Sequence, residues 1–220
     1  MTLSTAPVGL YSSECVSGAI RRPLSAWDMK IKRLPAGFVV PAQPVKASKP
    51  TSGPDWVHEI KHDGYRLIVR RDGPIVRLYT RTAYDWTARL PAIAAAAGRI
   101  KAKSFTIDGE AVVLGPDGLS RFEELRRRSA AHAAILYAFD LIEHDGEDLR
   151  DRPYLDRKAA CTATVAGLRT LIQTGHGPLA RLLRDTEVGI LLNEHVAGDG
   201  PTVFEHALRL GGSIGAVDFL

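Results

Sequence analysis

The sequence predicts an α+β fold in which antiparallel sheets carry peripheral helices. Short apolar runs meet at Asp-Gly pairs, Asp72-Gly73 and Asp145-Gly146, which favour tight turns between antiparallel strands. Stretches with helical spacing lie between these runs, so strands and helices are interspersed along the chain. Parallel strands would need long crossover connections, which turns of this length do not supply.

The N-terminal part of the chain has a composition typical of loosely ordered segments. Residues 1–33 mix Ser, Thr, Gly and Pro with small residues and include the basic stretch Met29–Arg33, so we expect them to be disordered or loosely packed. A lead-in punctuated by Pro35, Pro41, Pro44 and Pro50 follows.

The elements between Trp56 and residue 128 follow from their apolar periodicity and turn residues. A strand begins at Trp56, a helix is expected where alanine dominates, and Pro116-Asp117-Gly118 closes a strand. The expected elements are a hairpin of Tyr65–Arg71 and Ile75–Thr80, a helix over Leu90–Ile100, a strand over Phe105–Leu114 and a short helix over Phe122–Arg128.

The second half of the chain is predicted in the same way. Pro153 precedes a long stretch of helical spacing, and Gly200-Pro201 is typical of a helix start. The expected elements are a buried strand over Ala134–Ile142, a helix over Tyr154–Thr174, a strand over Val188–His195 and a helix over Gly200–Leu210.

Composition excludes several classes of protein. The chain has 220 residues, 45% of them hydrophobic and 25% charged, as expected for an ordinary globular domain. It has no apolar run of membrane-spanning length and no secretory signal, and Cys15 and Cys161 match no metal-ligand spacing, so we expect a cytoplasmic protein. The pI near 9.2 suits a nucleic-acid partner but equally suits a mildly basic protein without one.

The segment Glu59–Arg66 (EIKHDGYR) is the most informative part of the sequence. It places Lys61 in a strand-like run, followed by an acid, a glycine and an arginine. A lysine amine has a pKa of roughly 10.4 and becomes a nucleophile only where its surroundings favour the neutral form. Gly64 would let the backbone approach a ligand closely, and Arg66 offers a planar fork for phosphate or ribose oxygens.

Such a pattern also arises without any function. A lysine at a strand end is usually a solvated charge, and Asp-Gly is usually a turn. Residues elsewhere in the chain are needed to decide between the two interpretations.

The segment Trp56–Leu67 resembles the nucleotidyl-transfer motif of ATP-dependent DNA ligases and mRNA capping enzymes, and is most similar to the ligase module of bacterial end-joining ligase D. The resemblance runs from about Leu34, so residues 34–211 are interpreted as an adenylation domain of nucleotidyltransferase fold. It implies transfer of AMP from ATP to Lys61, with Mg²⁺ required.

Two further motifs extend the resemblance. Asp108-Gly109-Glu110 matches a family motif whose Glu contacts the ribose, which implies that role for Glu110, although a turn with a solvated Glu is the commoner meaning. Tyr137–Leu141 (YAFDL) matches the adenine-stacking motif, which implies that Phe139 stacks on the base. An isolated Phe in an apolar strand would more often be core packing.

The resemblance also assigns roles near the hairpin and the lysine. Tyr79-Thr80-Arg81 implies that Arg81 meets the nucleotide or the phosphate of a nicked strand. Glu59 lies two residues before Lys61, on the same sheet face if the segment is extended, and would help to recognise adenine. Arg66 would contact the ribose.

The match stops after Gly211. The family has a Glu-Gly-Ile/Leu-Val-x-Lys motif there, whose Glu binds metal, but residues 212–220 read GSIGAVDFL. We therefore expect an atypical tail, an adenylation domain incomplete at its C-terminal end, and no identified metal ligand.

The sequence thus predicts an ATP-dependent DNA ligase module that forms a lysine–AMP intermediate during DNA repair or recombination. Its expected partners are nicked or broken double-stranded DNA and other end-joining or repair proteins, with no membrane. A remnant that binds nucleotide or nucleic acid without transferring AMP is the alternative. RNA ligation or GTP-dependent capping is a third interpretation.

Overall fold

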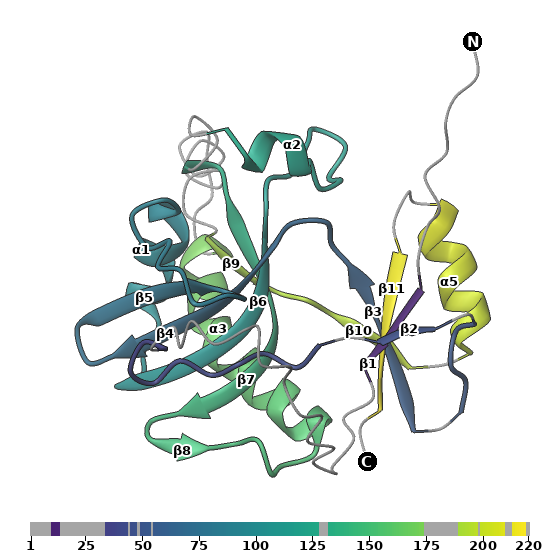
Figure 1. The fold of residues 1–220 in the computed structure, drawn as a ribbon, viewed down its shortest axis with the longest axis horizontal. Coiled ribbons are helices and arrows are strands. Elements are labelled where there is room, and N and C mark those ends of the chain that lie inside the picture. The colour runs from purple at the N-terminus through teal and green to yellow at the C-terminus, as the bar shows by residue number, and fades with distance from the viewer. Residues whose placement is uncertain are drawn as a thin grey trace, which may run out of the picture.

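The computed structural model describes residues 10–13, 34–43, 45–47, 49–53, 55–127, 132–173, 189–197, 199–209 and 213–218. These residues form two sheets with helices around them (Figure 1). Most of the segment 1–33, for which we expected loose packing, lies outside the described residues. The exception is Leu10–Ser13, which forms strand β1.

The larger sheet has six strands and carries the main core. Its order is β5-β4-β6-β7-β8, with β9 beside β7. Only β9 pairs in parallel, so the predicted antiparallel character is confirmed for the other strands. The strands are β4 (Tyr65–Asp72), β5 (Ile75–Thr80), β6 (Ser104–Val112), β7 (Ile135–His144), β8 (Glu147–Asp148) and β9 (Ile190–Leu192).

The predicted turns of this sheet are confirmed by their backbone angles. Gly73, between β4 and β5, has φ +55°, which suits glycine in a tight hairpin turn. Asp145 and Gly146, between β7 and β8, also have positive φ, of 48° and 90°.

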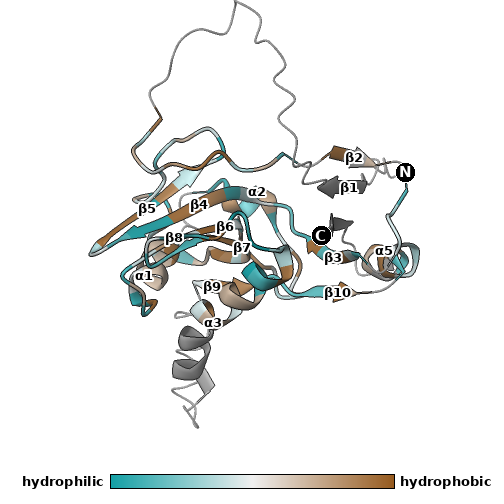
Figure 2. Cartoon of the chain, turned by 90° about the horizontal axis from the view of Figure 1, so that it is seen from below, coloured by the Kyte–Doolittle hydropathy of each residue, from teal (hydrophilic) through white to brown (hydrophobic). Residues whose placement is uncertain are grey.

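Two helices cover one face of the larger sheet. In α1 (Pro91–Arg99), Ile93, Ala96 and Ala97 are buried at helical spacing. The buried stripe of α3 (Tyr154–Gln173) packs on the same core cluster, and Figure 2 shows both helices on the same side of the sheet. The opposite face is covered by the lead-in, where Phe38 and Val39 pack on a small buried cluster. The predicted short helix is α2 (Phe122–Leu125).

The smaller sheet has five strands in the order β10-β3-β11-β1-β2. Its strands pair antiparallel except β1 and β11, which are parallel, contrary to the antiparallel pairing that we predicted. Helix α5 (Gly200–Arg209) contacts β3 and β11. Asp199 begins this helix, because its carboxylate accepts hydrogen bonds from the Thr202 amide and hydroxyl. The remaining strands are β2 (Val45–Ala47), β3 (Trp56–Lys61), β10 (His195–Ala197) and β11 (Ser213–Asp218).

The predicted strand Val188–His195 differs from expectation in its described part, and the tail forms a strand for which we made no structural prediction. β11 lies within the atypical tail, pairs with β3 and places Ser213 opposite Lys61. The single strand is two strands, because the chain leaves the larger sheet after β9, passes through Asn193 and Glu194, and enters the smaller sheet as β10. The pattern of apolar and polar residues in this segment does not indicate which sheet each residue joins.

The described part of the chain contains no helix long and apolar enough to span a membrane.

Leu67 tests the core of the larger sheet. Its side chain is fully buried between β4 and the helices, so Leu67→Ala should lower the free energy of unfolding by about 2–5 kcal/mol. Ile75→Ala is the control, since Ile75 is 54% exposed and should change stability by about 0.5 kcal/mol or less. Urea denaturation measures both, and equal effects would contradict the assigned core.

Candidate active site

The site lies where the chain passes from the smaller sheet to the larger one. β3 ends at Lys61, residues His62 to Gly64 make the connection, and β4 starts at Tyr65 (Figure 1). Lys61 is therefore carried by one sheet, while the residues that face it come from the other.

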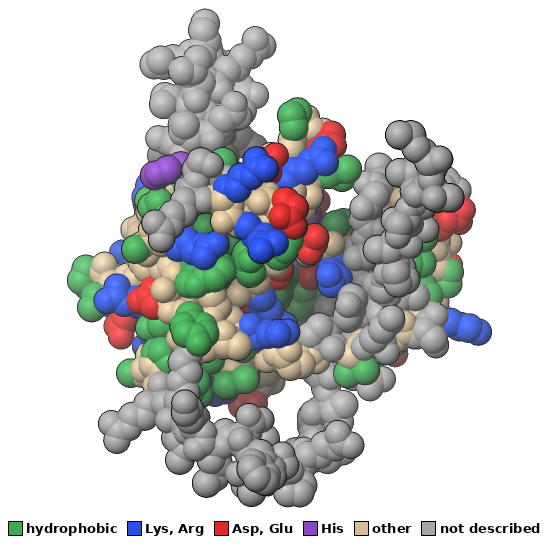
Figure 3. Space-filling model, turned by 45° about the horizontal axis from the view of Figure 1, so that its top comes forward, with side chains coloured by type: hydrophobic (Ala, Val, Ile, Leu, Met, Phe, Trp, Pro, Cys, Tyr) green, Lys and Arg blue, Asp and Glu red, His purple; other side chains and the backbone are tan. Residues whose placement is uncertain are grey.

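A pocket of about 620 Å³ opens beside this connection, a volume usual for ligand sites. Figure 3 shows a hollow with Lys and Arg side chains gathered at its rim. The structure brings all of the predicted site residues to its walls: Lys61, Glu59, Arg66, Arg81, Glu110 and Phe139. Their individual roles stay predictions.

Gly64 is required by packing inside the protein. A Cβ at this position would lie 2.1 Å from the carbonyl oxygen of Ala111 on β6. Because Gly64 has no side chain, the connection can lie directly on β6, next to Glu110. Gly64 also lines the pocket, and the close approach to a ligand that we expected there stays a prediction.

Phe139 reaches the pocket through an irregularity in β7. Asp108 pairs with Asp140 and Gly109 pairs with Ala138, so Phe139 is skipped in a β-bulge. Both Phe139 and Asp140 consequently line the pocket. Gly109 permits this arrangement, because a Cβ there would lie 2.7 Å from the carbonyl oxygen of Tyr137.

Arg66 is held by a buried acid that the sequence did not single out. Its Nε and Nη2 donate to the two oxygens of Asp108 at 2.9 and 2.7 Å, and Nη1 donates to the carbonyl of Ala42 at 2.6 Å. Burial alone would lower the pKa of Arg66, but the hydrogen bonds and charge of Asp108 raise it. The guanidinium also lies over the Phe139 ring, 5.3 Å from its centre.

Among the carboxylates that line the pocket, Glu110 has a pKa that lies far from its usual value. Burial raises its pKa to about 7, although the charges of Lys61 and Arg66 lower it. Glu110 is the register partner of Arg66 on the adjacent strand. It is therefore part protonated near neutral pH and can donate as well as accept hydrogen bonds.

Glu59 lies at the other end of the pocket among buried donors. Lys158 and Tyr154 from α3 donate to Oε1, the latter at 2.7 Å, and Asn193 donates to Oε2 at 3.2 Å. Burial, with the Glu59 charge, raises the pKa of Tyr154, so its hydroxyl stays a donor. Beside this group, Arg157 binds both oxygens of Asp140 at 2.9 and 3.0 Å.

His62 connects this group to the crossing next to Lys61. Asn193 uses its amide nitrogen on Glu59, so its Oδ1 accepts from His62 Nε2 at 3.1 Å. The imidazole stacks on Tyr137 at 3.8 Å between ring centres. Burial lowers the pKa of His62, which keeps it neutral near pH 7.

Sequence reasoning missed Asp108, Tyr154, Lys158 and Asn193. Lys158 had a signal, because it falls on the same helical face as Tyr154, Cys161 and Val165, all buried. A lysine on a core-facing stripe requires a buried partner. Asp108 also had a signal, because it begins the Asp108-Gly109-Glu110 motif, although no role was assigned to it, whereas Asn193 had none.

The described residues contain no group of three His, Cys, Asp or Glu side chains that could hold a metal ion. Mg²⁺ that arrives with nucleotide phosphates needs only one or two protein carboxylates. Of the carboxylates that line the pocket, Glu59 and Asp140 are ion-paired to Lys158 and Arg157, so Glu110 is the one that, within the described residues, could help to hold the ion.

Comparison with known proteins identifies related sequences. Residues 40–175 match the family described as ATP dependent DNA ligase domain. The chain is 38% identical over 168 residues to a probable DNA ligase of Streptomyces griseus, covering 66% of this chain and 33% of that protein. It is 38% identical over 133 residues to the multifunctional non-homologous end joining protein LigD of Pseudomonas aeruginosa, covering 59% of this chain and 16% of that protein.

Solved structures agree with these relatives. A mycobacterial DNA ligase D complexed with ATP and MES superimposes with a TM-score of 0.53 at 30% identity. The superposition covers 76% of this chain and 52% of that one. This chain therefore spans about half of the solved ligase chain and a third or less of the two curated relatives.

Gly64→Ala tests the packing of the connection. Its Cβ would overlap the Ala111 carbonyl, so the variant should lose about 1–3 kcal/mol in the free energy of unfolding. Gly98→Ala is the matched control, because Gly98 lies in the last turn of α1 with nothing within 4 Å of a Cβ, and the variant should gain up to about 1 kcal/mol. Urea denaturation measures both variants. An unchanged free energy of unfolding in Gly64→Ala would disprove the close packing of Gly64 on Ala111.

Glu110 should make stability depend on pH. Its pKa is raised from 4.5 to about 7 by folding, so the folded protein binds the proton more tightly than the unfolded chain. This contribution is complete below about pH 4.5 and is lost as the pH rises through about 7. Glu110→Gln should remove this contribution. From pH 5 to pH 8.5, the free energy of unfolding of the variant should therefore rise by on the order of 2 kcal/mol relative to that of the unmodified protein. If the free energies of unfolding of the two proteins changed in parallel with pH over this range, the burial of Glu110 would be refuted.

Proposed function

Since this chain belongs to the ATP-dependent DNA ligase family, we propose that it is an adenylation module that transfers AMP from ATP to Lys61 for the sealing of DNA strand breaks. The observation that carries the proposal is the meeting of Lys61, Glu110 and Phe139 in one pocket, although they come from three strands of two sheets.

The pocket suggests how ATP would lie. The purine would stack on Phe139 near Glu59, and the ribose hydroxyls would bind Glu110, which can both donate and accept. The triphosphate would then extend past Lys61 toward Arg81. Arg66 already uses three donors on Asp108 and Ala42, so it would act on the ribose through its remaining N–H groups while it supports Phe139.

The reaction would form one bond and break another. The neutral amine of Lys61 attacks the α-phosphorus, a nitrogen–phosphorus bond forms, and the bond to the bridging oxygen breaks. Pyrophosphate leaves with the electron pair, and the nitrogen releases its extra proton. The chemistry that Mg²⁺ would supply with the triphosphate is neutralisation of the charge on the departing oxygens.

Strand sealing is a proposal for the complete activity, because the curated relatives are longer than this chain. AMP on Lys61 would pass to the 5′-phosphate at a nick in double-stranded DNA, and the 3′-hydroxyl would then displace it. Arg81, exposed at the rim of the pocket, is the candidate contact for a DNA phosphate. Other end-joining or repair proteins remain proposed partners.

A second candidate function is binding of nucleotide or nucleic acid without AMP transfer. It is favoured by β11, because this strand pairs with β3 at Lys61 but its sequence, SIGAVD, contains neither the Glu nor the Lys of the family motif. Fewer charged groups at this edge would reduce the stabilisation of the transition state.

Incubation with α-labelled ATP and Mg²⁺ separates the two candidates. The proposed enzyme forms a covalent, acid-labile AMP adduct, which Lys61→Ala should abolish completely because it removes the nucleophile. Lys101→Ala is the control, since Lys101 is an exposed lysine outside the pocket, and it should label normally. An adduct that survives Lys61→Ala would disprove the role of Lys61, and its absence from the unmodified chain would favour the binding candidate. Labelling by GTP in place of ATP would point to capping chemistry.

A further inference from the structure

Lys158 is a buried charge that the proposed reaction does not use. Its side chain, on the sheet-facing stripe of α3, is only 1% exposed. A lysine at this depth costs free energy unless a partner compensates its charge. The partner is Glu59, which is 8% exposed and lines the pocket. The pair therefore joins the helix layer to the base end of the site.

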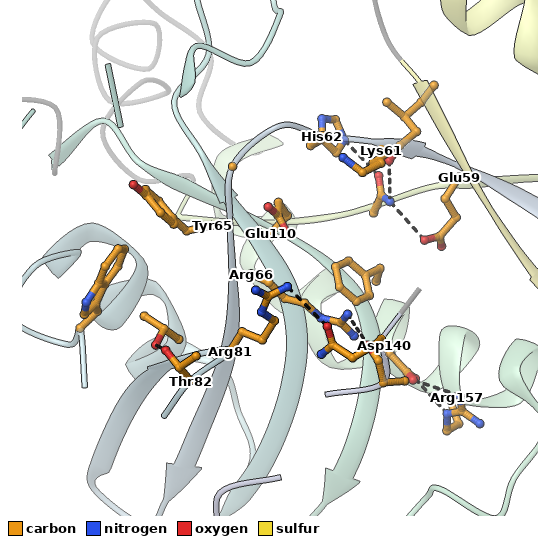
Figure 4. A pocket seen from close by; sticks show the side chains of 18 of the residues that line it. Glu59, Lys61, His62, Tyr65, Arg66, Arg81, Thr82, Glu110, Asp140 and Arg157 are labelled. Atoms are coloured by element: carbon orange, nitrogen blue, oxygen red, sulfur yellow. Dashed lines mark hydrogen bonds and ion pairs between the residues drawn. The ribbon is translucent and has the colours of Figure 1, made fainter. Parts of the chain in front are cut away.

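The donors around Glu59 leave one acceptor position for a ligand. An ionised carboxylate has about four lone-pair sites. Lys158 and Tyr154 occupy those of Oε1, and Asn193 occupies one of Oε2. The remaining site belongs to Oε2, the oxygen that Asn193 holds, and Glu59 is one of the side chains that line the pocket (Figure 4).

Each of these donors is fixed by a second contact. Lys158 Nζ also donates to the Phe139 carbonyl at 3.2 Å, and Tyr154 OH lies 3.1 Å from the same oxygen. The backbone amide of Asn193 donates to Ala138 at 2.7 Å. The orientation of Glu59 is thus tied to the stretch of β7 that carries Phe139.

We propose that Lys158 is a positioning residue that, together with Tyr154 and Asn193, holds Glu59 as an acceptor-only carboxylate, and thereby makes the pocket prefer 6-aminopurine over 6-oxopurine nucleotides. An exocyclic amine at C6 donates to the remaining lone pair. A carbonyl oxygen at C6 would face that lone pair, and the site would have no donor to offer it. This inference rests on the proposed function, since it assumes that a purine occupies the Phe139 end.

Loss of Lys158 should change this preference. Without the ammonium, the buried Glu59 loses the partner that compensates its charge and fixes its orientation. The carboxylate then no longer holds one lone pair in a fixed place against the purine, so the penalty against GTP falls. A purely structural ion pair would instead alter stability and leave the ratio of the two nucleotide affinities unchanged.

Equilibrium dialysis with labelled ATP and labelled GTP, in EDTA so that no AMP is transferred, tests the proposal. The unmodified chain should bind ATP more tightly than GTP. Lys158→Met should reduce the ratio of the GTP Kd to the ATP Kd by about tenfold. Tyr154→Phe, which removes one hydroxyl, should reduce it by about threefold. Lys101→Met removes an exposed lysine and should leave the ratio unchanged.

A double variant shows whether Lys158 acts through Glu59. In a Glu59→Gln background, Lys158→Met should cause no further change in the ratio, because the group it positions is already neutral. Independent, additive effects would overturn the proposal. An unchanged ratio of the two Kd values in Lys158→Met, together with normal ATP binding, would also overturn the proposal. That result would not affect the proposed function.

The remaining outcomes also decide. If Lys158→Met does not fold, as judged by its thermal unfolding, Tyr154→Phe carries the test, and an unchanged ratio there overturns the inference. If the unmodified chain binds neither nucleotide, the proposed function and the inference fall together.

Discussion

The hydrogen bond between His62 and Asn193 ties together two crossings between the sheets. One crossing follows β3 and the other follows β9, so each bonded residue belongs to a segment that leaves one sheet for the other. The walls of the pocket come from different sheets, and their spacing depends on these connections. Gly64 adds a steric constraint, because only a residue without a side chain can lie against the Ala111 carbonyl. Lys61 is consequently held next to Glu110.

Charges in the pocket are arranged in pairs that leave few groups to adjust when a ligand binds. Arg66 is bound to Asp108, Arg157 to Asp140 and Lys158 to Glu59. Such pairs contribute little net stability after desolvation, but removing one partner leaves an uncompensated buried charge. Their value for a reaction is preorganisation, because donors and acceptors already fixed in place need no reorganisation as charge develops. Glu110 differs, since burial leaves it able to exchange a proton near neutral pH.

Membership of the ATP-dependent DNA ligase family agrees with this arrangement. The α+β fold and the superposition on a mycobacterial ligase D at 30% identity agree with it as well. β11 lies beside the strand of Lys61 but carries different residues from the family motif expected there.

Local sequence determined much of this protein. Asp72-Gly73 sufficed for the β4–β5 hairpin, the alanine-rich run for α1 and Pro153 for the start of α3. These features depend on neighbouring residues and on turn geometry. Tertiary structure alone decided that residues 190–197 divide between two sheets, that the tail supplies β11, and that a bulge turns Phe139 into the pocket. It also paired Glu59 with Lys158, 99 positions away. Buried charges find their partners by proximity in the folded core, and no local pattern encodes that distance.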